Sequence, residues 1–138
     1  MKETLSMEDR AALVKYRMER SDETIQEAIY SAQGGWYNLA VNRLYYACYY
    51  AAVAVLISKS VETQSHSGVR TMMALHLVKE GILAKEHRTT FTSLFHSRQS
   101  SDYDDFVKCD VDTYNDFLLK AKNCIDALKK IIETSNSL

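Results

Sequence analysis

The sequence predicts an all-α protein, an antiparallel up-and-down bundle of about five helices that forms a single domain over residues 1–138. The chain contains no proline and only four glycines, so the strongest helix breakers occur at residues 34–35, 68 and 81 alone. Apolar residues recur at helical spacing, and no strand-like alternation persists for more than a few residues. Long helices with short connections are therefore expected.

The first helix is expected over residues 6–33. Its apolar residues, Val14 and Ile25 among them, follow a helical spacing, and Ser21-Asp22 is a candidate break within it. Gly34-Gly35 ends this helix, because consecutive glycines disfavour helical structure.

The second helix, over residues 36–59, is apolar on every side and is therefore predicted to lie at the centre of the bundle. Arg43 is the only charged residue between Asn38 and Ile57. An arginine is almost never fully buried without a partner, since its guanidinium cannot be deprotonated in a protein. We therefore expect a carboxylate or carbonyls to meet Arg43 inside the bundle.

The remaining helices follow from the same spacing. A third is expected over residues 69–80, with Ser65 or Ser67 as its N-cap and Gly81 after its end. A fourth covers residues 85–101, and a fifth covers residues 111–134.

Composition excludes several classes of function. With 17 basic and 18 acidic residues the net charge is −1, which argues against a broad cationic surface for non-specific nucleic-acid binding and leaves room for a small basic site. The three cysteines form no Cys-x-x-Cys pair, as expected of reduced thiols in a cytoplasmic protein. The apolar run 44–57 is shorter than the roughly 20 residues that a membrane span needs, so no membrane insertion is expected.

A second inward-facing arginine is predicted on the fourth helix. The apolar stripe through Phe91 and Phe95 continues to Arg98, which is followed at once by a cluster of acids, Asp102, Asp104 and Asp105, with Tyr103 among them. Two interpretations stay open. The arginines and acids could form an internal ion-pair network that fixes helix register, or they could line a polar cleft where an arginine stabilises a phosphate.

The residues at these positions carry a resemblance to a known family. Tyr45-Tyr46-Ala47 preceded by Asn42-Arg43, then Ser65-His66-Ser67-Gly68, then Arg98 followed by Asp102-Tyr103-Asp104, resemble the motifs of the HEPN domain in its small, single-domain bacterial branch. The resemblance covers nearly the whole chain. It implies a helical bundle that forms a homodimer, a minimal nucleotidyltransferase partner in a toxin–antitoxin pair, and, for many members, metal-independent ribonuclease activity.

The resemblance also assigns candidate site residues. The family's catalytic signature is an arginine followed four to six residues later by a histidine; Arg98 matches the arginine, whereas residues 103–105 are Tyr, Asp and Asp. A tyrosine, with a pKa of about 10, is a poor base at neutral pH. The candidate catalytic residues are Arg98, Asp102 and Tyr103, and the candidate polar cleft comprises Arg43, Asn42, Tyr46, His66 and Asp104.

The sequence therefore supports two hypotheses about function. The first is a dimeric interaction module that works with a nucleotidyltransferase, RNA or a nucleotide. The second is a ribonuclease toxin in which Arg98 stabilises the transition state and a residue other than the usual histidine moves the proton.

The histidines and the tyrosines of the second helix also have structural interpretations. His66 could cap the third helix, form a hydrogen bond in the core or contact a ligand. The tyrosines at 45, 46, 49 and 50 could stack on bases, although a core or homodimer interface is favoured. His76 and Glu80 lie four residues apart, but two ligands do not make a metal site, and no phosphate-loop or dinucleotide fingerprint is present, so neither metal nor cofactor is expected.

Overall fold

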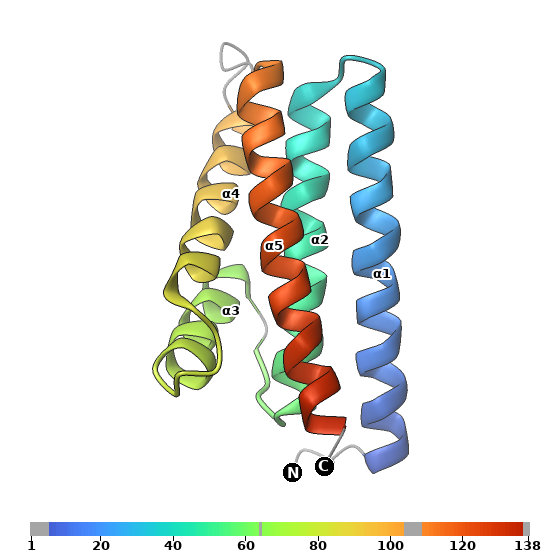
Figure 1. The fold of residues 1–138 in the computed structure, drawn as a ribbon, viewed down its shortest axis with the longest axis vertical. Coiled ribbons are helices and arrows are strands. Elements are labelled where there is room, and N and C mark those ends of the chain that lie inside the picture. Colours follow the sequence, from blue (N-terminus) through green and yellow to red (C-terminus); the bar gives the residue numbers. More distant parts are fainter. Residues whose placement is uncertain (1–5, 64, 104–108, 137–138) are drawn as a thin grey trace.

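The predicted all-α bundle is confirmed by the computed structural model, which describes residues 6–63, 65–103 and 109–136, and for residues 99–103 and 135–136 the backbone alone. Four long helices run up and down: α1 (Met7–Gln33), α2 (Tyr37–Ser58), α4 (Lys85–Tyr103) and α5 (Val111–Asn136). The short α3 (His66–Met73) continues into a π-helical turn, η1 (Ala74–Val78), and lies beside the lower end of α4 (Figure 1).

Helix α2 is the centre of the bundle, as its composition predicts. Leu44, Ala47, Ala51 and Val55 are fully buried, and α2 packs against α1, α5, α4 and α3. Its alanines let the backbone of α1 approach closely, and the Ser21 hydroxyl of α1 donates a hydrogen bond of 2.7 Å to the Ala47 carbonyl of α2. This contact ties the two helices together in a site from which water is excluded.

The predicted break at Ser21-Asp22 is wrong, because α1 is continuous through both residues. The Ser21 side chain is fully buried and bonded to α2, while the Asp22 carboxylate lies 2.5 Å from the Lys129 ammonium of α5. Both polar side chains that suggested a break are therefore used in contacts between helices. Helix α1 ends at the Gly34-Gly35 turn, where Gly35 has a φ of 83°, a conformation that glycine adopts without strain.

The third helix begins three residues earlier than expected, at His66. The Ser65 hydroxyl accepts a hydrogen bond of 2.9 Å from the Gly68 amide, which makes Ser65 the N-cap. A side chain at position 68 would collide with Thr63, so glycine lets the preceding loop pack closely against this first turn. The expected end near Glu80 is replaced by the turn η1, which closes at Val78.

Among the described helices, α2 has the length and composition to cross a membrane, with 22 residues and a mean hydropathy of 1.3. A large part of it, 61% of the apolar window, is buried inside the bundle. The apolar character of α2 is therefore explained by its central position.

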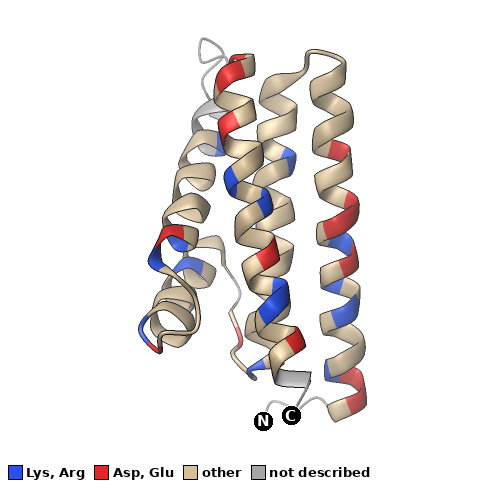
Figure 2. Ribbon diagram, in the orientation of Figure 1, with Lys and Arg blue, Asp and Glu red and all other residues tan. Residues whose placement is uncertain are grey.

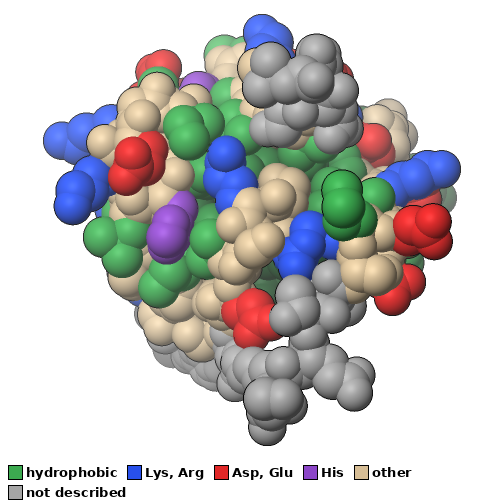
Figure 3. All heavy atoms as spheres, turned by 90° about the horizontal axis from the view of Figure 1, so that it is seen from below, with side chains coloured by type: hydrophobic (Ala, Val, Ile, Leu, Met, Phe, Trp, Pro, Cys, Tyr) green, Lys and Arg blue, Asp and Glu red, His purple; other side chains and the backbone are tan. Residues whose placement is uncertain are grey.

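Charge is spread over the outer faces of the bundle. Basic and acidic residues are mixed along α1 and α5 (Figure 2). Seen from the end where α1 begins and α5 ends, charged side chains of both signs stand around the rim, with hydrophobic side chains between them (Figure 3). No broad cationic face is visible in this view, in keeping with the net charge of −1.

Candidate functional site: an arginine–aromatic surface

One edge of α2 is left partly open between α1 on one side and α3 and α4 on the other. Eight side chains meet along it, all half-buried, and together they are called the arginine–aromatic surface: Arg43, Tyr46, Tyr49 and Tyr50 of α2, His66 and Arg70 of α3, and Phe95 and Arg98 of α4. On α2, Arg43, Tyr46 and Tyr50 share one edge because they are spaced three and four apart along the helix, and Tyr49 follows Tyr46 by three residues.

Arg98 lies where α4 meets α2. Its Nη1 atom donates a hydrogen bond of 3.1 Å to the Tyr46 hydroxyl. Its Cζ atom lies 5.2 Å from the ring centroid of Tyr45 and 5.6 Å from those of Tyr46 and Phe95. A guanidinium within about 6 Å of an aromatic face is attracted by the ring quadrupole. The rings therefore help to hold a cation that is half removed from water.

His66 enters the same cluster from the first turn of α3. Its Nδ1 atom lies 2.5 Å from the hydroxyl of Tyr45, a residue that is fully buried, and its ring lies 4.6 Å from that of Tyr49. Burial, and after it the charge of Arg98, lower the pKa of His66. Burial also raises the pKa of Tyr45, against the opposing effect of Arg98, so the phenol stays protonated at neutral pH. The imidazole is thus neutral and oriented by a protonated phenol.

Arg70 was not among the residues singled out from the sequence. Its Cζ atom lies 4.3 Å from the centroid of the Phe95 ring, and its Nε atom is buried without a hydrogen bond to any described residue. The spacing could have indicated it, because Arg70 follows His66 by four residues on the same helix. A buried guanidinium donor without an acceptor suits an anionic ligand.

The expectation that Arg43 is a buried cation in the core is wrong. Its guanidinium is partly exposed, it lies 3.5 Å from the Glu27 carboxylate of α1, and it donates hydrogen bonds of 3.1 and 2.8 Å to the Asn42 side chain. The Tyr46 ring lies 5.0 Å away. Arg43 sits on the open edge of α2, so its ion pair with Glu27 contributes at most about 1 kcal/mol.

The acidic cluster after Arg98 lies outside the described part of the chain. Helix α4 continues through Asp102 and Tyr103, but their side chains and all of residue Asp104 are not described. The predicted pairing of these acids with Arg43 or Arg98 stays a prediction.

Further arginines extend the surface toward α1. The Cζ atom of Arg20 lies 5.4 Å from the Tyr50 ring, and the charge of Arg17 opposes the rise that burial causes in the pKa of Tyr49. The Nε atom of Arg17 is buried and has no hydrogen-bond partner among the described residues. A chain of near-zero net charge therefore gathers arginines from four helices around one group of rings.

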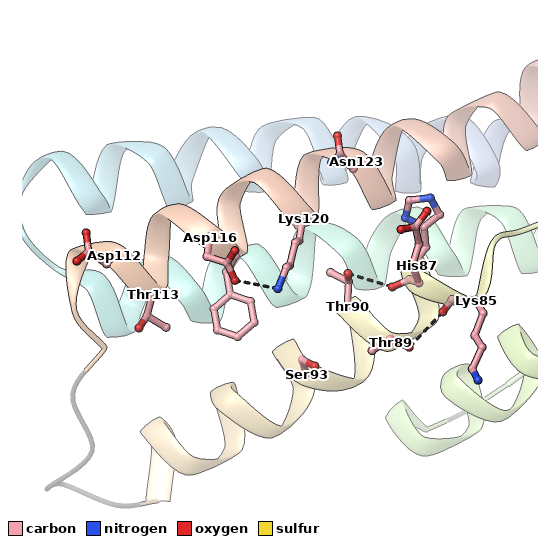
Figure 4. A pocket seen from close by; sticks show the side chains of 12 residues that line it. Lys85, His87, Thr89, Thr90, Ser93, Asp112, Thr113, Asp116, Lys120 and Asn123 are labelled. Atoms are coloured by element: carbon pink, nitrogen blue, oxygen red, sulfur yellow. Dashed lines mark hydrogen bonds and ion pairs between the residues drawn. The ribbon is translucent and has the colours of Figure 1, made fainter.

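A groove of about 980 Å³ lies between α4 and α5 (Figure 4). Some of the polar side chains that line this groove bond within the protein. Lys120 pairs with Asp116 at 2.9 Å, and the Thr89 and Thr90 hydroxyls donate to carbonyls of their own helix. None of the described residues that line the groove has a buried polar side-chain atom without a hydrogen bond. The volume of the groove by itself therefore does not indicate a binding site.

Metal chemistry finds no support in the described residues, among which no three His, Cys, Asp or Glu side chains lie close enough to hold an ion. Cys48 and Cys124 are both fully buried. A contact with Cys124, together with burial, raises the pKa of the Cys48 thiol well above its ordinary value. These thiols are packing groups.

The electrostatic link between Arg98 and His66 can be measured. In the wild-type protein we expect the pKa of His66 to lie below the usual value of about 6.5, and in Arg98→Ala to rise part of the way back, since burial is the larger cause. Because the unfolded state then binds the proton more readily, the free energy of unfolding should fall as the pH drops below about 6.5. Imidazole NMR titrations give both pKa values.

The matched control for this titration is Lys122→Ala, which removes one positive charge from an exposed position on α5. It should leave the titration of His66 where it is. An unchanged titration in Arg98→Ala would show that the guanidinium does not act on the ring.

Comparison with known proteins places the chain in a family. A model of the HEPN domain matches residues 14–138. A UPF0332 protein of Thermotoga maritima is 30% identical over 92% of this chain and 96% of its own length. Two proteins of Methanocaldococcus jannaschii, named "Putative toxin MJ0142" and "Putative toxin MJ0605", are 27% and 26% identical over 88% and 84% of this chain, and over 82% and 86% of their own lengths. The chain therefore belongs to the HEPN domain family.

Proposed function

We propose that this chain is the toxin-type member of a two-protein system and that it binds RNA through its arginine–aromatic surface. The observation that carries the proposal is the position of Arg98, which is hydrogen-bonded to Tyr46 and lies against the rings of Tyr45, Tyr46 and Phe95. A guanidinium is a planar fork of donors that matches the oxygens of a phosphate, and here its approach is fixed by rings.

The residues around Arg98 have the chemistry that single-stranded RNA requires. Arg43 and Arg70 supply two more guanidiniums, and the Nε atom of Arg70 is a buried donor without a hydrogen bond to the described residues. The half-buried rings of Tyr46, Tyr49 and Phe95 can stack on bases, which every base permits through its π-face. A net charge of −1 limits this binding to one local surface.

The relatives support the biological setting. The two Methanocaldococcus proteins carry toxin names, and the HEPN resemblance implies a minimal nucleotidyltransferase as the second protein. Such a partner would act by covering the arginine–aromatic surface or by changing its charge.

Binding of a fluorescent single-stranded RNA, followed by anisotropy in the absence of metal ions, tests the proposal. We expect Arg98→Ala to weaken binding by about tenfold and to reduce the slope of log affinity against log salt by about 0.7, the value for one phosphate contact on a single strand. Arg98→Lys should recover part of the loss, since it keeps the charge without the planar fork.

Lys122→Ala is again the control of equal charge, because Lys122 is exposed on α5, which contributes no residue to the arginine–aromatic surface. An equal loss of RNA affinity in Arg98→Ala and Lys122→Ala would mean that binding depends only on the overall charge of the protein. If the wild-type protein binds no RNA, the proposed RNA binding is contradicted.

Exposed apolar side chains favour a homodimer as well. Tyr30, Trp36 and Leu39 are 78%, 68% and 52% exposed and lie around the turn between α1 and α2. Leu39 is one helical turn from Arg43. Apolar side chains gathered at one place on a surface are typical of protein interfaces. We infer that a second copy of this chain covers them and extends the arginine–aromatic surface.

A measurement of the oligomeric state tests the inferred homodimer. Sedimentation should give a dimer for the wild-type protein and a monomer for Leu39→Glu, because the new carboxylate would be buried without a partner. Leu119→Glu, which introduces the same charge at a residue of α5 that is 62% exposed, should remain a dimer. A monomeric wild-type protein would contradict the inference.

A further inference from the structure

We propose that a groove at one end of the bundle, between α1 and α5, binds a fatty carboxylate, with the alkyl chain of the ligand along α1 and its carboxylate at Lys15. The groove shares no residue with the arginine–aromatic surface. The inference therefore goes beyond the RNA binding proposed above and does not depend on it. Its ligand is defined by chemistry, as an unbranched apolar chain that ends in one negative charge.

The groove lies where the first half of α1 meets the last turns of α2 and α5, at the lower end of the bundle in Figure 1. Helix α1 packs chiefly on α2 and much less on α5, so the space between α1 and α5 is incompletely filled there. The volume of the groove is about 520 Å³. Pockets for small ligands typically measure about 300–1,000 Å³, so the groove has the size for a small molecule.

A stripe of apolar side chains on α1 forms one wall of the groove. Its members, at steps of three and four residues along one face of the helix, are Met7, Ala11, Val14 and Met18. With a rise of about 1.5 Å per residue, the stripe is roughly 16 Å long. Ile132 of α5 also lines the groove. An unbranched alkyl chain can lie along this stripe.

The depth of the groove comes from the sizes of these side chains. Val14 is buried, and Met18 and Ile132 are partly buried against the core, so they form an apolar floor. Ala11 is small and leaves space above this floor, while Met7 is 89% exposed. Methylene groups that leave water for such a floor favour binding, and flexible methionine side chains adapt to the shape of a ligand.

Basic side chains outnumber acidic ones around the groove. Arg10, Lys15 and Lys129 line it together with a single carboxylate, that of Glu133. The Nη1 atom of Arg10 donates a hydrogen bond of 2.9 Å to the Ile57 carbonyl, which ties α1 to the end of α2. An apolar groove with a mainly basic rim is complementary to an apolar ligand that carries a negative charge.

Lys15 is the basic residue that is most available to such a ligand. The Lys129 ammonium lies 2.5 Å from the Asp22 carboxylate and so joins α5 to α1. The Lys15 ammonium lies 4.0 Å from the Glu19 carboxylate, and both side chains are well exposed. A long, exposed pair of this kind contributes little, so Lys15 can turn to a carboxylate in the groove at small cost.

NMR spectra of the protein labelled with ¹³C at its methionine methyl groups, recorded during a titration with decanoate, test the proposal. Met7 and Met18 line the groove, whereas Met72 and Met73 belong to α3. We expect the methyl signals of Met7 and Met18 to shift and those of Met72 and Met73 to stay in place, and the titration also gives the affinity. If the signals of Met7 and Met18 do not move, the proposal is overturned.

A substitution that fills the groove tests where the chain of the ligand lies. Ala11→Trp should weaken decanoate binding by about tenfold or more, since losing the burial of two methylene groups already costs about that factor. Ala12→Trp is the matched control, because Ala12 is also exposed on α1 and does not line the groove, and it should bind like the wild-type protein. Equal affinity of the two variants would overturn the proposed site. Thermal midpoints check that each variant is folded.

A comparison with 1-decanol, which has the same chain without the charge, tests the role of Lys15. The wild-type protein should bind decanoate about two- to fivefold more tightly than 1-decanol, the range for an exposed ion pair. Lys15→Gln should lose most of this preference, while Lys122→Gln, which removes the same charge from α5 outside the groove, should keep it. No preference in the wild-type protein, or an unchanged one in Lys15→Gln, would contradict a carboxylate held at Lys15.

Discussion

The contact of Arg98 with the rings of Tyr45, Tyr46 and Phe95 determines how the rest of the surface is arranged. Helix α2 is apolar on nearly every side because α1, α4 and α5 pack around it, and Tyr45 is buried beneath the one edge that stays partly open. At this edge aromatic faces attract the cation, and the Tyr46 hydroxyl accepts one of its hydrogen bonds.

This arrangement depends on small features elsewhere in the chain. The alanines of α2 and the buried Ser21 hydroxyl let α1 approach closely, which brings Arg17 and Arg20 to the edge where the tyrosines lie. The Ser65 cap and the close packing at Gly68 start α3 early enough for His66 to reach Tyr45. The fold thus contributes to the site by setting where helices begin and how closely they pack.

Helical spacing and glycine positions in the sequence predict the bundle and its central helix. The grouping of Arg98, Tyr46 and His66 in one cleft comes from the resemblance to the HEPN domain. It does not reveal that Glu27 pairs with Arg43, since that contact joins two helices whose rotation about their axes is set by packing. Arg70 follows His66 by four residues, but the sequence does not show that it reaches Phe95 of α4, and it was therefore missed. The expected break at Ser21-Asp22 failed because tertiary contacts overrode local propensity.

Growth of bacteria that express the protein from an inducible promoter tests most directly whether Arg98 is the centre of the function. The wild-type protein should slow growth, Lys122→Ala should slow it equally, and Arg98→Ala at the same protein level should grow like cells with an empty vector. Equal growth of the wild-type and Arg98→Ala cultures would contradict a toxin that acts through the arginine–aromatic surface.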